Sequence, residues 1–156
     1  MTEVRRFEPA DHDAVVTLVL DAQQREFGIA ITYDDQPDLQ DPLGFFDGRF
    51  WVAVDGELVG CVGLLDVGLG TGVVRKMFVD PARRGAGVAQ RLLTTLVDAA
   101  RSDGMTELLL GTTSAYHAAH RFYEKSGFAL VDPDDLPERF PRVEVDSRFY
   151  RMALEA

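Results

Sequence analysis

The chain has 156 residues, of which 46% are hydrophobic and 27% are charged, so it has the size and composition of one globular domain with a buried core. Its 26 acidic and 16 basic residues give a formal net charge of −10, and a surface this acidic repels a nucleic-acid backbone. These numbers predict a single domain over residues 1–156 and exclude nucleic acid as the expected partner.

The sequence shows neither a secretion signal nor a membrane span. Its start, MTEVRRFEPADHD, has no hydrophobic signal segment, and no uninterrupted apolar run reaches membrane-spanning length. We therefore expect a cytoplasmic protein with no membrane partner. The single cysteine, Cys61, lies in an apolar run with no obvious base or cation beside it, so we interpret it as a buried, inert thiol.

The first third of the chain predicts a strand, a helix and an irregular segment. Residues 3–7 have the pattern of a short strand, and Pro9-Ala10-Asp11 predicts a helix start with Asp11 as the N-cap. The helix stops at Gly28, and its apolar face consists of Val15, Leu18, Val19, Ala22 and Phe27. Residues 29–48 have no clear period, which fits either a substrate-side loop or short helix, or a variable surface excursion.

The middle of the chain predicts a hairpin followed by a third strand. Residues 50–54 and 58–65 are β-rich and are separated by Asp55-Gly56, a strong signal for a tight turn between antiparallel strands. A glycine-rich turn at residues 68–72 leads into a predicted strand over residues 73–79.

The second half of the chain predicts a parallel crossover. A helix after Gly85 ends at Gly104, and its apolar face consists of Val88, Leu92, Leu93, Leu96, Val97 and Ala100. The apolar strand expected at 107–111 follows this helix, which favours a parallel βαβ unit. The remaining predicted elements are a helix over 114–126 closed by Gly127, a strand over 128–131, a Pro-rich loop over 132–141 and a strand over 148–154. This order predicts an α/β fold with a mixed sheet and helices on both faces.

Residues 73–93, VVRKMFVDPARRGAGVAQRLL, carry the strongest functional signal. A strand breaks at Asp80-Pro81, passes Gly85 and Gly87, and becomes an amphipathic helix. Glycines let the backbone approach a ligand closely, and a helix start directs unpaired N–H groups toward an anion. The pattern predicts a pyrophosphate cradle, and the alternative is a tight turn without a ligand. A dinucleotide fingerprint would need glycine where Gln90 stands, and no phosphate-binding NTPase loop is present.

Two motifs together resemble the GNAT superfamily of acetyl-CoA-dependent N-acyltransferases. The first is Arg-x-x-Gly-x-Ala, at Arg84, Gly87 and Ala89, and the second is FYEKSGF at residues 122–128. The resemblance covers nearly the whole chain. It implies a single-domain GNAT-like fold, with a mostly antiparallel mixed sheet and a parallel βαβ crossover.

The resemblance also implies where acetyl-CoA would bind. In such enzymes the turn around the pyrophosphate donates backbone N–H groups, and the edge of the preceding strand pairs with the pantetheine amides. The cofactor-binding residues carried over to this sequence are Met77, Phe78, Val79, Arg84, Gly85, Ala86, Gly87, Val88 and Ala89.

Acyl transfer to an amine needs a proton for the departing thiolate and polarisation of the thioester carbonyl. Tyr123 stands at the family's general-acid position, and a phenol is protonated at neutral pH. A packing role for this aromatic ring is compatible with the catalytic one. A backbone N–H near Phe78 or Val79 would polarise the carbonyl. Tyr116 occupies a position where many relatives have asparagine, and it fits a role beside the cofactor arm, in the acceptor pocket or in plain packing.

The general base stays open at this point, because Val73 and Val74 precede Arg75 where many relatives carry a glutamate. A water chain is one alternative, and the side-chain candidates are Glu26, Asp34, Asp35, Asp66, His117 and His120. The spacing of the two histidines is compatible with metal binding, but no third ligand is evident and we expect no metal site.

The expected function is transfer of an acetyl or short acyl group to a primary amine of a small molecule or peptide. The acidic surface and Asp-rich loop favour a cationic acceptor such as a polyamine, an aminoglycoside or a lysine side chain. The alternative is a catalytically silent acyl-CoA sensor or docking module. Because superfamily members often pair through late strands, the tail over residues 139–154 also predicts a possible homodimer edge, with pairing inside the chain as the alternative.

Overall fold

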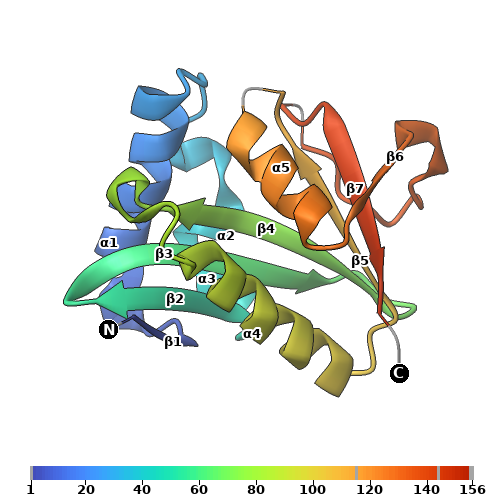
Figure 1. Cartoon of the computed structure of the whole chain (residues 1–156), viewed down its shortest axis with the longest axis horizontal. Coiled ribbons are helices and arrows are strands. Elements are labelled where there is room, and N and C mark those ends of the chain that lie inside the picture. The colour runs from blue at the N-terminus through green and yellow to red at the C-terminus, as the bar shows by residue number, and fades with distance from the viewer. Residues whose placement is uncertain (1, 115, 144, 155–156) are drawn as a thin grey trace.

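The computed structural model describes residues 2–114, 116–143 and 145–154. Its strands form one seven-stranded sheet in the order β1-β2-β3-β4-β5-β7-β6 (Figure 1). The strands are β1 (Glu3–Arg6), β2 (Phe50–Asp55), β3 (Glu57–Asp66), β4 (Thr71–Val79), β5 (Glu107–Thr112), β6 (Ala129–Val131) and β7 (Arg148–Ala153). The β4–β5 pair is parallel and the other neighbouring pairs are antiparallel, which confirms the predicted mixed sheet and βαβ crossover.

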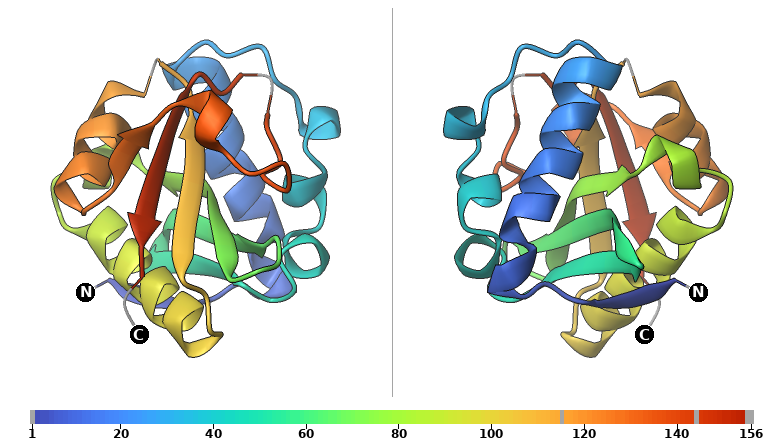
Figure 2. Two further views of the ribbon diagram at one scale, coloured as in Figure 1. Left: turned by 90° about the vertical axis from the view of Figure 1, so that its right-hand side faces the viewer. Right: turned by 90° about the vertical axis from the view of Figure 1, so that its left-hand side faces the viewer.

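Helices cover both faces of the sheet (Figure 2). One face carries α4 (Val88–Ser102) and α5 (His117–Lys125), and the other carries α1 (His12–Leu20), α2 (Pro37–Gln40) and α3 (Pro42–Phe45). Successive side chains of a strand point to opposite faces of the sheet, so each strand contributes to the cores under both helix layers. Trp51 of β2 belongs to the core under α4, whereas its neighbours Phe50 and Val52 pack in the core beneath α1 and α2.

The hairpin and the main helix agree with the sequence patterns. Gly56 turns the chain between β2 and β3 with a φ of +74°, a conformation that glycine adopts without strain. The predicted apolar face of α4 is buried except for Val97, which packs partly buried against the same core. Burial of this face is the main contribution that helix α4 makes to stability.

The structure corrects the capping role of Asp11 and the helix bounds, and it shows which local structure residues 29–48 adopt. Asp11 stands at the predicted N-cap position of α1, but its side chain makes no capping hydrogen bond. Its carboxylate instead accepts hydrogen bonds from the backbone N–H of Glu8 and from Arg5, each at 2.8 Å, because a guanidinium is a stronger partner than a free helix end. A π-helical turn over Asp21–Glu26 continues α1, and α5 begins at His117 rather than at 114, with position 115 outside the described residues. Residues 29–48 contain the short helices α2 and α3 together with a 3₁₀ turn at Tyr33–Asp35.

The C-terminal tail pairs inside the chain. Strand β7 lies between β5 and β6, so it is an interior strand and not a free sheet edge. Phe140, Phe149 and Tyr150 are buried in the core. The tail therefore does not form a free dimer edge at β7, and the alternative of pairing inside the chain is confirmed. Burial of these aromatic side chains in the core contributes more free energy to folding than their exposure at a sheet edge would.

None of the helices in the described part of the chain combines the length and apolar character needed to cross a membrane.

Candidate active site

Strands β4 and β5 pair over the first three residues of each strand and then separate. Both strands are fully described, and their pairing covers Thr71–Val73 against Glu107–Leu109. The rest of β4 continues beside β3, while β5 diverges from it (Figure 1). The second half of β4 therefore presents an edge with backbone N–H and C=O groups that β5 does not use.

The backbone of Val79 faces away from β3. The N–H of Asp80 donates to the carbonyl of Val59 on β3 at 2.8 Å, and neighbouring residues in an antiparallel pair point their amides in opposite directions. The carbonyl of Val79 accordingly accepts a hydrogen bond from Arg84 at 3.4 Å on the other side. This geometry matches the predicted region for carbonyl polarisation, near Phe78 or Val79.

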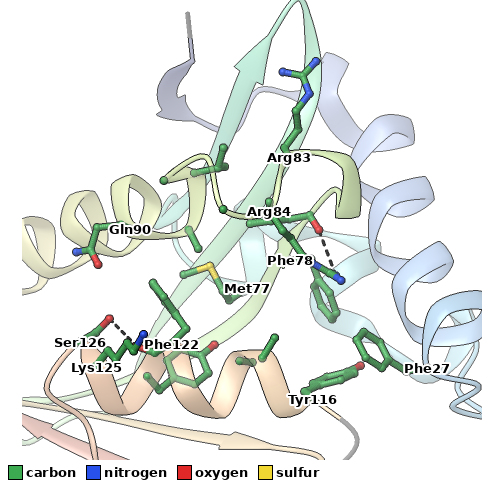
Figure 3. A pocket seen from close by; sticks show the side chains of 18 residues that line it. Phe27, Met77, Phe78, Arg83, Arg84, Gln90, Tyr116, Phe122, Lys125 and Ser126 are labelled. Carbon is green, nitrogen blue, oxygen red and sulfur yellow. Dashed lines mark hydrogen bonds between the residues drawn. The ribbon is translucent and has the colours of Figure 1, made fainter.

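A cavity of about 430 Å³ opens between this edge, the start of α4 and helix α5. Phe122 and Lys125 of α5 and the following Ser126 lie at one end, and Phe27 and Tyr116 lie at the other (Figure 3). The remaining lining residues are Met77, Phe78, Val79, Arg83, Arg84, Gly85, Gly87, Val88, Ala89, Gln90, Ala118, Ala119 and Tyr123. The described lining residues include three positively charged side chains, Arg83, Arg84 and Lys125, and no aspartate or glutamate, although the chain carries a net charge of −10.

The turn before α4 has the geometry of an anion cradle. Asp80 begins it by accepting the N–H of Ala82 at 2.9 Å. Gly85 and Gly87 both have a φ of +83°, and a Cβ placed on either glycine meets nothing within 4 Å. Gly87 is the residue that precedes α4, so the unpaired N–H groups of the first helical turn start here. The two glycines keep this concave backbone open.

Arg84 is held by partners on the N-terminal side of the cavity. Its guanidinium pairs with both carboxylate oxygens of Glu26 and lies 5.9 Å from the centre of the Phe27 ring. The ion pair raises the pKa of Arg84. Glu26, one of the candidate bases, is therefore engaged in an ion pair with Arg84.

Tyr123 is 6% exposed and packs with Phe128 and Tyr150, at ring-centre distances of 5.5 and 6.1 Å. Burial, and then the nearby Asp146 charge, raise the pKa of its phenol. Burial also raises the pKa of Tyr116, to about 12. Both phenols therefore keep their protons throughout the neutral range, as a proton donor requires.

A second cavity, of about 100 Å³, lies on the other side of the β4 edge. Its charged lining residues are Arg75, Lys76 and Asp146. The two cavities share Met77, Phe78, Tyr116, Ala119 and Tyr123. The two cavities therefore adjoin one another at these residues.

A bulge in β4 places Arg75 and Lys76 together. Successive side chains of a regular strand point to opposite faces. Lys76 has a φ of +57° at a register shift between β3 and β4, and this turn sends its side chain the same way as that of Arg75. Both cations reach Asp38 of α2, at 3.0 Å from Lys76 and 3.2 Å from Arg75. Burial lowers the pKa of Lys76, and the charge of Asp38 opposes that shift.

Asp146 enters the second cavity from the tail. Its own N–H donates to the carbonyl of Val143 at 2.9 Å, and the N–H of Ser147 donates to the carbonyl of Thr112 on β5 at 3.0 Å. A Cβ on Gly111 would lie 2.5 Å from the Asp146 carboxylate, so glycine leaves the space that this side chain occupies. Burial raises the pKa of Asp146 from 3.8 to about 6, while Arg75 and Lys76 act to lower it.

The raised pKa of Asp146 predicts a pH-dependent effect on stability. When a carboxyl has a higher pKa in the folded than in the unfolded protein, the free energy of unfolding falls as pH rises from about 4 to about 6, because the folded environment disfavours the ionised form. Asp146→Asn removes this penalty and is expected to raise the free energy of unfolding at pH 8 by roughly 1–3 kcal/mol. Urea unfolding at pH 8 and pH 3.5 measures it, and an equal gain at both pH values contradicts the assignment.

The other base candidates have structural partners. Asp35 accepts hydrogen bonds from the backbone N–H and the hydroxyl of Thr32, both at 3.0 Å, and Asp66 accepts the N–H of Gly68 at 2.9 Å. His120 is buried and donates from Nε2 to the carbonyl of Thr113 at 2.8 Å. None of these three lines either cavity among the described residues, and the same holds for Asp34 and His117. Sequence reasoning missed Asp146, because its loop has no motif and only the fold brings it beside β4.

The Cys61 prediction is confirmed. The thiol is fully buried, donates to the carbonyl of Lys76 at 3.2 Å, and has its pKa raised by burial to about 12. A thiol in that state is a poor nucleophile. Within the described residues, no group of three or more His, Cys, Asp or Glu side chains lies close enough together to hold a metal ion.

Comparison with known proteins identifies the family. Residues 14–128 match the model of the Acetyltransferase (GNAT) family, which is more than half of the chain. The chain therefore belongs to the GNAT family of acetyltransferases, and this confirms the resemblance inferred from its motifs.

Individual relatives agree with this membership. The chain is 43% identical over 90 residues to the IAA acetyltransferase of Azospirillum brasilense; the match covers 56% of this chain and 58% of that protein, so the chain spans little more than half of that relative. A GNAT-family acetyltransferase structure from Staphylococcus aureus superposes with a TM-score of 0.96 at 29% identity, covering 99% of this chain and 100% of the other.

A more distant neighbour shares the fold. The N-acetylglutamate synthase of Neisseria gonorrhoeae, solved with coenzyme A and N-acetyl-glutamate, has a TM-score of 0.79 at 20% identity over 100% of this chain and 36% of its own.

Proposed function

We propose that residues 1–156 form one N-acetyltransferase domain, which moves an acetyl or short acyl group from acetyl-CoA to the primary amine of a small molecule or peptide by direct attack in a ternary complex. The observation that carries the proposal is the meeting of two cavities at Tyr123, Met77 and Phe78. A donor and an acceptor can reach one another there from opposite sides of the β4 edge. Family membership supports the same reaction class.

The first cavity fits coenzyme A by its shape and its charge. The space beside Gly85 and Gly87 suits a pyrophosphate against main-chain N–H groups, and a Cβ on either glycine would project into it. The edge of Met77, Phe78 and Val79 suits the pantetheine amides. Arg84, Val88 and Ala89 also line this cavity, whereas Ala86 lies in the turn between the two glycines and does not line it. The N-acetylglutamate synthase of the same fold was solved with coenzyme A.

The bound donor supplies an acetyl thioester, whose carbon gains a bond to the amine nitrogen and loses its bond to sulfur. Tyr123 gives its phenolic proton to the departing sulfur, and the phenolate then recovers one proton from solvent. The amine gives up one proton, so the protons balance. The backbone N–H of Val79 would stabilise the negative charge that develops on the carbonyl oxygen. The raised pKa of Tyr123 keeps the donor protonated.

Thiol release tests this proposal. The protein is incubated with acetyl-CoA and a panel of primary amines, and free thiol is followed while calorimetry measures coenzyme A binding. Amine-dependent thiol release supports an acetyltransferase. Tight coenzyme A binding with no release for any amine favours the silent sensor or docking module and overturns the proposed activity.

We also propose that the protein acts in the cytoplasm and forms a homodimer. Because β7 is an interior strand, we place the dimer contact at the neighbouring sheet edge, β6, where Leu130 is 57% exposed. Sedimentation equilibrium of the wild type and of Leu130→Lys measures this. A dimer that dissociates at least about tenfold more readily in the variant is expected. A monomeric wild type, or a dimer unchanged by the substitution, contradicts it.

A further inference from the structure

The lining of the second cavity carries two positively charged side chains, Arg75 and Lys76, and one carboxylate, Asp146. Arg75 and Lys76 stand on one side, and the single carboxylate of Asp38 is shared between them at 3.2 and 3.0 Å. Asp38 is 1% exposed, so it lies behind the two cations rather than in the cavity. Two cations share this one carboxylate, and the other carboxylate whose charge interacts with them is Asp146, in the lining of the same cavity.

The opposite charge belongs to Asp146. This carboxyl faces Arg75 and Lys76 from β4 and Tyr116 and Tyr123 from the α5 region. It therefore stands between the cation pair and the two phenols that line both cavities. An acceptor amine beside Asp146 would be close to the point where the donor cavity opens.

We propose, on the basis of the acetyltransferase function above, that the second cavity takes a small amino-carboxylate such as an amino acid, with its carboxylate at Arg75 and Lys76 and its amine at Asp146. The cavity is small, and its charges are arranged as a zwitterion requires. A polyamine or an aminoglycoside would bring a second cation toward Arg75 and Lys76, which repel it. The pattern therefore reverses the preference for a cationic acceptor that the net charge suggested.

Asp146 has a defined part in this arrangement. An amino acid reaches the site as an ammonium, and its nitrogen attacks only after losing a proton. Two protons therefore leave the nitrogen, one before the attack and one as the amide forms. The Asp146 carboxylate accepts the first and passes it to solvent. The second is lost as the C–S bond breaks and balances the proton that Tyr123 gives to the sulfur and recovers from solvent. The carboxylate has to be ionised for this step. With its pKa raised to about 6, kcat/KM should rise with pH through that value.

A paired set of acceptors tests the proposal. Thiol release from acetyl-CoA is measured with each of the twenty L-amino acids and with the matching α-carboxamides, which keep the amine and lack the charge. We expect at least one amino acid to exceed its amide about tenfold or more in kcat/KM. Arg75→Gln should remove most of that preference through a 10- to 100-fold rise in KM, and Arg75→Lys should restore part of it.

Asp146→Asn provides the second test. It should lower kcat about 100-fold for the amino acid and its amide alike, and abolish the rise of activity near pH 6. Two matched controls, Arg142→Gln and Asp135→Asn, make the same charge changes at exposed positions of the same tail outside both cavities, and they should leave the kinetics unchanged.

The outcomes separate this inference from the acetyltransferase proposal. If carboxamides or polyamines are acetylated as fast as amino acids, the amino-carboxylate site is overturned, whereas the proposed acetyltransferase activity is supported. If no acceptor releases thiol, calorimetry of amino acids with the coenzyme A-loaded protein decides: binding that Arg75→Gln abolishes supports the cavity assignment, and absence of binding overturns it.

Discussion

Gly87→Glu is expected to weaken coenzyme A binding about 100-fold or more while the protein remains folded. The new side chain would enter the open space in front of the α4 N-terminus, where a Cβ now meets nothing within 4 Å. A carboxylate about 4 Å from a diphosphate oxygen is repelled by several kcal/mol at the effective dielectric near a protein surface, and about 2.7 kcal/mol corresponds to a factor of 100. Calorimetric titration with coenzyme A measures the change.

A control has to separate charge repulsion from backbone strain, because any side chain at a φ of +83° is strained. Gly104 has a φ of +80° and equally open space, but it follows α4 at its far end. Gly104→Glu should therefore lose similar stability in thermal unfolding and keep full coenzyme A affinity. An unchanged affinity in Gly87→Glu would show that the cradle is assigned to the wrong turn.

Tyr123→Phe should reduce kcat by a factor of about 100 or more and leave the affinity for coenzyme A unchanged. General acid catalysis by a positioned side chain contributes roughly 10²- to 10⁴-fold, and the substitution removes only the hydroxyl. The ring keeps its contacts with Phe128 and Tyr150, so the fold is retained. Because the pKa of Tyr123 is raised, the wild type should also show no loss of activity between pH 7 and pH 9.

Tyr33→Phe is the matched control for this experiment. Tyr33 bonds His12 at 3.2 Å and lines neither cavity among the described residues, so its variant should keep wild-type kcat. A Tyr123→Phe enzyme with normal kcat assigns the residue to packing. A lower kcat together with weaker coenzyme A binding would point to a distorted cavity instead of a lost proton donor.

The correct parts of the sequence interpretation rest on local physics. Asp55-Gly56 between two β-rich runs encodes a tight hairpin turn, and the spacing of Leu92 and Leu96 encodes an apolar helix face. The mistakes arose where a distant partner competes with a local one. Asp11 was expected to cap a helix, but Arg5 on β1 takes its carboxylate.

The candidate site divides in the same way. The proposed anion cradle is one continuous segment, Arg84 to Ala89, and the proposal depends on main-chain N–H groups and on glycines, which a sequence pattern can indicate. The acceptor side has no continuous motif. Arg75, Asp38 and Asp146 belong to a strand, a short helix and a tail loop, and their separation along the chain is much larger than any local pattern.

The sequence by itself determined the class of this protein, the GNAT family, and the turn proposed to hold its cofactor, because both depend on neighbours within a few residues. Only the tertiary structure decided which charges face the acceptor. The left-handed turn at Lys76 brings two consecutive side chains to one face, and the packing of the tail on β5 adds Asp146 to them. Electrostatic interactions act through space, so the net charge of −10 suggested a cationic acceptor, whereas the charges that line the folded cavity are the basis for proposing a zwitterion.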